Sequence, residues 1–62
     1  MSVSVGRLEE MAAKIEELHK LADELKQLAG DDFETVRRNA SRILANIKIL
    51  EINVVEVIKE LR

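Results

Sequence analysis

The chain has 62 residues, a net charge of −2, one histidine and no cysteine. The lack of cysteine excludes disulfide bonds and thiolate metal sites, and the nearly balanced charge gives no overall attraction to nucleic acid or to an anionic membrane. A chain of this length forms one domain at most and buries only about 60% of its unfolded surface. Such small domains usually need a disulfide, a metal or a partner subunit, so we expect association with another chain.

The sequence begins with MSVSVG, and residues 1–6 are predicted to be a frayed N-terminal segment. Ser4 and Gly6 compete as the N-cap of the first helix. This helix is expected over about residues 7–29, because its apolar residues alternate at intervals of three and four, the heptad pattern of helices that pack lengthwise. These residues are Leu8, Met11, Ile15, Leu18, Ala22, Leu25 and Ala29, with Leu21 and Leu28 widening the stripe on one flank.

A loop of about residues 30–31 should follow the first helix. Gly30 is suited to the left-handed conformation that ends many helices. Asp31, with Glu34 three residues later, matches a capping box at the start of the next helix. So short a loop requires the two helices to be neighbours that run antiparallel.

The second helix is expected over about residues 32–61, within a hairpin domain of residues 7–62. Its apolar stripe repeats the intervals of three and four without a break. The stripe consists of Phe33, Val36, Ala40, Ile43, Ile47, Leu50, Val54, Val57 and Leu61, and Leu44 and Ile58 widen it. Pairing the two stripes around the loop gives three sets of neighbours: Ala22 with Ala40, Ile15 with Ile47, and Leu8 with Val54. The predicted fold class is therefore all-α, an antiparallel two-helix hairpin.

Two helices alone cannot enclose a core, because the widened flanks of both stripes stay in contact with water. Burying one Leu or Ile is worth about 1.5–3 kcal/mol, so exposing several of them forfeits much of a total stability of about 5–15 kcal/mol. A homodimer of hairpins, which makes a four-helix bundle, would cover these flanks, and a trimer or larger assembly is the alternative. The predicted interface residues are Leu18, Leu21, Leu25, Leu28, Ile43, Leu44, Ile47, Leu50, Val54, Val57, Ile58 and Leu61.

Three further apolar residues of the second helix, Ile49, Ile52 and Val55, fall away from its main stripe. They are either scattered surface residues, which are common, or a second interface for a larger assembly or a partner helix.

A column of asparagines also recurs every seven residues beside the main stripe. It is either solvated or a buried amide network that fixes the register and the number of chains. Its members are Asn39, Asn46 and Asn53.

No arrangement of residues suggests an enzyme or a bound cofactor, and no residue is assigned as catalytic or as a metal ligand. Glu16 and His19 have the Glu-x-x-His spacing of carboxylate-bridged di-iron bundles. The apolar stripe of the second helix offers no carboxylate to complete that site, so a weak metal site through His19 is only the third functional alternative.

Three arginines, Arg37, Arg38 and Arg42, cluster near the loop and either balance nearby acids or bind phosphate. Phe33 is the only aromatic residue and lies in the apolar stripe, so no side chain is free to stack on bases. Nucleic acid is therefore not the expected partner. No apolar run is long enough to span a membrane, and a cytoplasmic location is expected if the protein is natural.

The length and the short-loop hairpin plan resemble Rop-type RNA-binding hairpins, which pair into four-helix bundles. Residues that contact RNA in that family are not matched here, so the resemblance implies a homodimer and, as the alternative function, an RNA-binding regulator using the three arginines. The uninterrupted heptads, the Gly30-Asp31 loop and the asparagine column also resemble de novo designed helical-hairpin oligomers. The predicted function is self-association in a structural or protein-interaction role.

Overall fold

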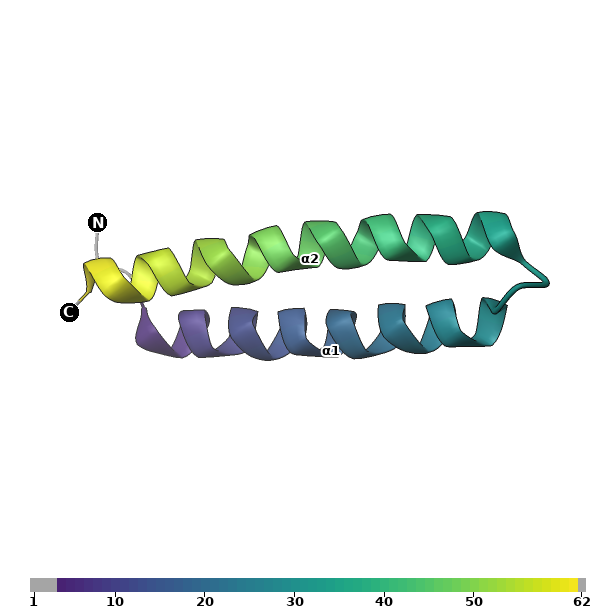
Figure 1. The fold of residues 1–62 in the computed structure, drawn as a ribbon. Coiled ribbons are helices and arrows are strands. Elements are labelled where there is room, and N and C mark those ends of the chain that lie inside the picture. The colour runs from purple at the N-terminus through teal and green to yellow at the C-terminus, as the bar shows by residue number, and fades with distance from the viewer. Residues whose placement is uncertain (1–3, 62) are drawn as a thin grey trace.

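The computed structural model describes residues 4–61 and contains two helices, α1 (Val5–Ala29) and α2 (Glu34–Glu60), with no strand among those residues. The helices lie side by side, and the loop joins them at one end (Figure 1). The start of α1 and the end of α2 lie together at the other end, where Val5 and Leu8 share a hollow with Ile58. The predicted all-helical hairpin of two packed helices is confirmed.

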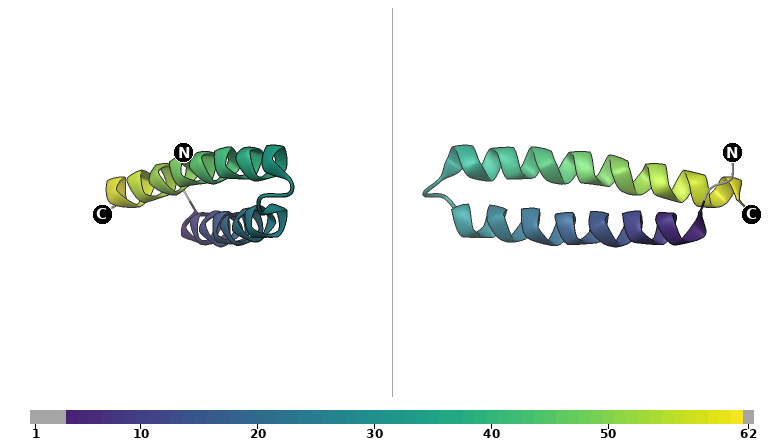
Figure 2. Two further views of the ribbon diagram at one scale, coloured as in Figure 1. Left: turned by 45° about the vertical axis from the view of Figure 1, so that its right-hand side comes forward. Right: turned by 180° about the vertical axis from the view of Figure 1, so that it is seen from behind.

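The molecule is a rod of 48 × 16 × 15 Å. Its radius of gyration is 14.5 Å, whereas a globular domain of this length has about 10–11 Å. Two further views show the helices remaining neighbours along their lengths, with no third element over either side (Figure 2). The described residues therefore form a single layer.

The N-terminal end of α1 is capped by Ser4, whose Oγ accepts a hydrogen bond from the N–H of Arg7 at 3.3 Å. This bond satisfies one of the backbone donors that a helix start leaves free. The helix consequently begins at Val5, two residues before the predicted start, and Gly6 lies inside it rather than capping it. Residues 5 and 6, which were predicted to belong to the frayed segment, are helical in the structure, and residues 1–3 lie outside the described part of the chain.

The loop covers residues 30–33 and is two residues longer than predicted. Gly30 ends α1 with a positive φ of 53°, as expected, but its ψ of −147° lies outside the predicted left-handed helical region. Its N–H donates to the carbonyl of Lys26 at 3.2 Å. The predicted capping box is wrong, because the residue that precedes α2 is Phe33, with no side-chain cap. The N–H of Phe33 donates to the Ala29 carbonyl at 3.2 Å, so Asp31 lies within the turn and not at the start of α2.

The helices contact each other along one column of residues from each. Leu8, Ala22 and Ala29 of α1 and Ala40 and Ile47 of α2 are at most 7% exposed. Within each helix these residues are separated by seven or fourteen positions, and the intervening Ile15 and the following Val54 are half-buried. Alanine has no bulk beyond its Cβ, so the alanines allow the two helices to approach closely. The buried positions agree with the pairing predicted from the sequence.

Candidate functional site

The two sides of the helix contact differ in chemistry. In a helix, the residue four positions after a buried one lies on one flank, and the residue three positions after it lies on the other. Ala12 and His19 of α1 share a hollow with Glu51 of α2, which places the "plus four" columns of both helices on the same flank. The "plus three" columns therefore share the opposite flank.

This opposite flank is apolar from both helices. Its "plus three" columns hold six large hydrophobic side chains, each between 41% and 48% exposed. A side chain that is half covered by its own hairpin still presents a continuous strip to the solvent. We refer to this strip as the open face, and it consists of Met11, Leu18, Leu25, Val36, Ile43 and Leu50.

The two edges of the open face are different. On the α1 edge, Leu21 is 62% exposed and Leu28 is 82% exposed, which are high values for leucine in a folded chain. The α2 edge carries the asparagine column, and each asparagine is exposed. Each lies three residues after a residue of the open face: Asn39 after Val36, Asn46 after Ile43 and Asn53 after Leu50. The asparagine column is therefore solvated in the single chain, and it would be covered only by a second molecule on the open face.

The chain exposes more surface than a globular domain of its mass. The accessible surface of the chain is 5353 Å². A folded monomer of 7.0 kDa exposes about 4,000 Å² according to the scaling of surface with mass. The excess is about 1,300 Å², whereas a stable interface buries about 800 Å² on each partner.

The residues predicted as the interface fall in three places. Ile47 is buried between the two helices of the hairpin, and Val54, seven residues later, is half-buried there. Val57 is also half-buried, but it continues the column of Val36, Ile43 and Leu50 at the edge of the open face next to the termini. Leu44 and Ile58 lie in the "plus four" column, on the flank that carries His19 and Glu51. The open face and its α1 edge take Leu18, Leu21, Leu25, Leu28, Ile43 and Leu50, whereas Leu61 lies beside Ile58 in the terminal hollow.

Two residues of the open face, Met11 and Val36, were missed by the sequence-based selection of interface residues. Both could have been selected from the sequence by their spacing. Met11 stands seven residues before Leu18, and Val36 stands seven residues before Ile43, and both of these later residues were selected. Their exposure shows that they belong to the same surface.

The possible second interface lies on the outer side of α2, away from α1. Ile49, Ile52 and Val55 are 49–55% exposed. Ile52 and Val55 share a shallow hollow with charged side chains of the same helix, including Lys48 and Glu56. Charged neighbours interrupt this strip, whereas the half of the open face next to the loop is bordered by leucines and asparagines.

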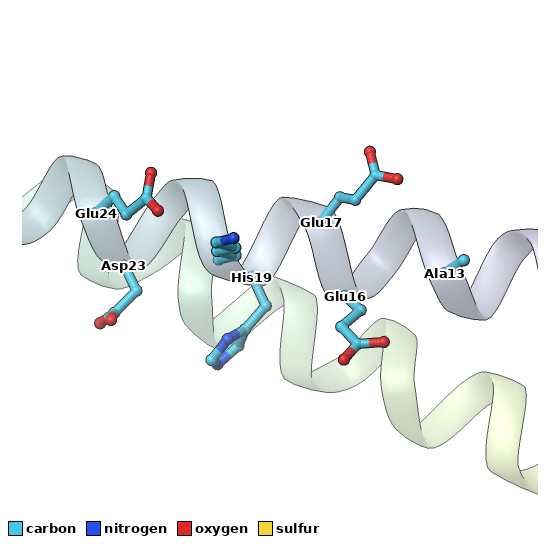
Figure 3. Close-up of a pocket in the computed structure, with 7 residues that line it drawn as sticks. Ala13, Glu16, Glu17, His19, Asp23 and Glu24 are labelled. Carbon is cyan, nitrogen blue, oxygen red and sulfur yellow. The ribbon is translucent and has the colours of Figure 1, made fainter.

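His19 lies at a shallow hollow formed entirely by α1. Figure 3 shows Glu16, His19 and Asp23 projecting to one side of the helix, with Glu17 and Glu24 directed to the other. Among residues 4–61, no group of three or more histidine and carboxylate side chains is arranged to hold a metal ion. The geometry gives no support to the metal-site alternative.

The three arginines near the loop do not form one surface. Arg38 is bound to Glu34 of the preceding turn, with Nη2 3.0 Å from Oε1. Arg37 is half-buried, and its Nε has no hydrogen-bond partner within the described residues. Arg42 is exposed on the outer side of α2. RNA binding through these side chains stays a prediction that the geometry does not favour.

Comparison with known proteins leaves the function to be argued from the geometry. No protein-family model, curated protein or solved structure matches the chain. Neither helix within residues 4–61 has the length and hydropathy needed to cross a membrane. Among the described residues, the open face is the feature from which a function can best be argued.

Proposed function

We propose that the protein is a self-associating helical-hairpin module whose role is structural or in protein interaction. In this proposal the hairpin is antiparallel and pairs with a second copy through the open face, which gives a four-helix homodimer. The observation that carries the proposal is the row of six half-exposed hydrophobic side chains on one flank, whereas the other flank mixes apolar residues with polar ones such as His19 and Glu51. Two such flanks placed face to face form the interior that a single layer lacks.

The free energy gained by burying the open face is comparable with the cost of association. Completing the burial of a half-exposed Leu, Ile, Val or Met is worth about 0.7–1.5 kcal/mol, which is half the value for full burial. Twelve such side chains in a dimer contribute about 8–18 kcal/mol as an upper estimate. The loss of translational and rotational freedom costs about 4–15 kcal/mol, so the gain from burial is of the same size as this cost, and the two bordering leucines add to the gain.

A second copy fits the open face better than an unrelated helix does. The face is two helices wide, and a partner that covers it must also present two adjacent apolar columns. The chain itself presents such a surface, and identical surfaces can pair through a two-fold axis. A single amphipathic helix would cover the central groove but leave the outer edge at Leu21 and Leu28 exposed.

The test is the molar mass in solution, measured by sedimentation equilibrium over a thousandfold range of protein concentration. We expect twice the 7.0 kDa of one chain at high concentration, with helicity retained. Three times that mass would indicate a trimer and would overturn the four-helix arrangement. A compact helical monomer at all concentrations would overturn self-association altogether.

A further inference from the structure

The open face is not uniform along the rod. On the half next to the loop it is lined and bordered by Leu21, Leu25, Leu28, Val36 and Ile43, and Phe33 of the loop, 63% exposed, lies at the same end. The half next to the chain termini contains Met11 and Leu50 as its exposed large apolar residues. The apolar surface is therefore concentrated toward the loop.

The two edges show the same gradient in charge. The α1 edge is formed by four residues spaced seven apart: Arg7, Lys14, Leu21 and Leu28. It therefore changes from cationic at the terminal end to apolar at the loop end. The corresponding column on α2 continues from the asparagines to Glu60 at the terminal end. A second copy must be oriented so that its apolar half meets the apolar half of the first copy and its charged end meets the charged end.

Two symmetric dimers bring the open faces together. When both loops lie at the same end, α1 of one copy packs beside α2 of the other. Apolar halves then meet, and Arg7 approaches Glu60 of the second copy. When the loops lie at opposite ends, α1 packs beside α1 in reverse. Arg7 then lies beside Leu28 of the second copy, and the apolar half of each chain meets the more polar half of the other.

From this asymmetry we propose that the dimer is assembled with both loops at the same end. The inference rests on the proposed self-association and specifies the orientation of the second copy. Burial is most favourable when the more apolar halves of the two faces cover one another, and a guanidinium group beside a covered leucine would lose solvation without gaining a partner. The same-end dimer satisfies both conditions, because its cations stay at the end that carries Glu60.

Distances between spin labels test the orientation directly. The chain has no cysteine, so D31C and K59C each give one label per chain, at exposed positions near the two ends of the rod. Two rods that are 16 × 15 Å in section and aligned with their loops together place both pairs of labels about 30 Å apart or closer. The molar mass of each labelled sample is measured in parallel.

Each outcome has one meaning. Short distances for both label pairs support the same-end dimer. Distances approaching the 48 Å length of the rod for both pairs would show loops at opposite ends and overturn the inference. A short distance at residue 31 with one beyond the rod length at residue 59 would show a staggered dimer and also overturn it. A mass of one chain would instead overturn the proposed function.

A charge exchange provides a second, independent test. Reversing the charge with R7E should raise the dimer dissociation constant about two- to tenfold at low salt, the range expected for two exposed ion pairs. E60R alone should also raise it. The double variant R7E/E60R should return the constant toward the original value, because the pair is restored with its signs exchanged. In the opposite-end dimer the two residues do not meet, and the effects of the single variants would simply add.

Discussion

Replacing Ile43 by glutamine tests the assignment of the open face most sharply, because the chain supplies a matched control. Ile43 is 46% exposed and lies on the open face, whereas Ile52 is 51% exposed and lies on the outer side of α2. Both are isoleucines within the same helix. The substitutions I43Q and I52Q therefore change helix propensity and hairpin packing by similar amounts and differ mainly in whether a second copy covers the site.

The expected magnitude follows from the exposed fraction. About half of the 1.5–3 kcal/mol for burying an isoleucine remains to be gained at residue 43, which is about 0.7–1.4 kcal/mol for each chain. A dimer contains the site twice, so I43Q loses about 1.4–2.8 kcal/mol, a 10- to 100-fold rise in the dissociation constant. Covering an amide that lacks a hydrogen-bond partner adds to this loss. I52Q should change the constant by less than about threefold, the usual limit for a substitution remote from the contact.

Sedimentation equilibrium gives the dissociation constants, and circular dichroism checks that both variants remain helical. Equal effects of the two substitutions would refute the assignment of the open face. A larger effect of I52Q would indicate that the outer strip of Ile49, Ile52 and Val55 is the interface.

Five further substitutions test the hairpin itself, each measured by thermal unfolding at one fixed protein concentration. G30A should lower stability by about 1 kcal/mol or more, because Gly30 has a φ of 53°, which is unfavourable for a residue with a side chain. G6A should raise stability slightly, since Gly6 is helical and the added methyl group meets only Ser4 Oγ at 3.7 Å. A40L should cost about 1–3 kcal/mol by overpacking a site that is 1% exposed, whereas A45L at an exposed position should change stability by less than about 0.5 kcal/mol. I47D places an unpaired carboxylate at a position that is 3% exposed and should abolish both helicity and association; a helical dimer of this variant would contradict the helix contact described above.

The sequence predicted the helices well because local physics determines them. Repeated apolar residues at intervals of three and four identify both helices, and Gly30 ends the first for a conformational reason that acts within one residue. The ends of the helices were less predictable. Ser4 and Gly6 were equivalent candidates by residue type, and the hydrogen bond to Arg7 decides for Ser4.

The start of α2 was predicted incorrectly for a similar reason. Asp31 and Glu34 have the spacing of a capping box, but spacing does not reveal which backbone groups are already bonded. The bond from Phe33 N–H to the Ala29 carbonyl continues the turn from α1 through the loop. The residue that precedes α2 is consequently an aromatic residue without a capping side chain.

By itself the sequence determined that two long amphipathic helices form and that they carry more apolar surface than one hairpin covers. Within each stripe two columns of residues at seven-residue intervals are both apolar. Pairing around the loop favoured the columns of Ala22 and Ala40 as the helix contact, but the pattern could not show how far the other columns stay exposed. The tertiary structure decided this by burying the columns that contain Ala22, Ala29 and Ala40 and leaving those with Leu18, Leu25 and Ile43 half exposed. The physical reason is that Ala22, Ala29 and Ala40 let the two helix backbones approach closely near the loop, while Leu8 and Ile47 fill the contact farther along. The other column is then rotated outward, where a second layer can pack against it.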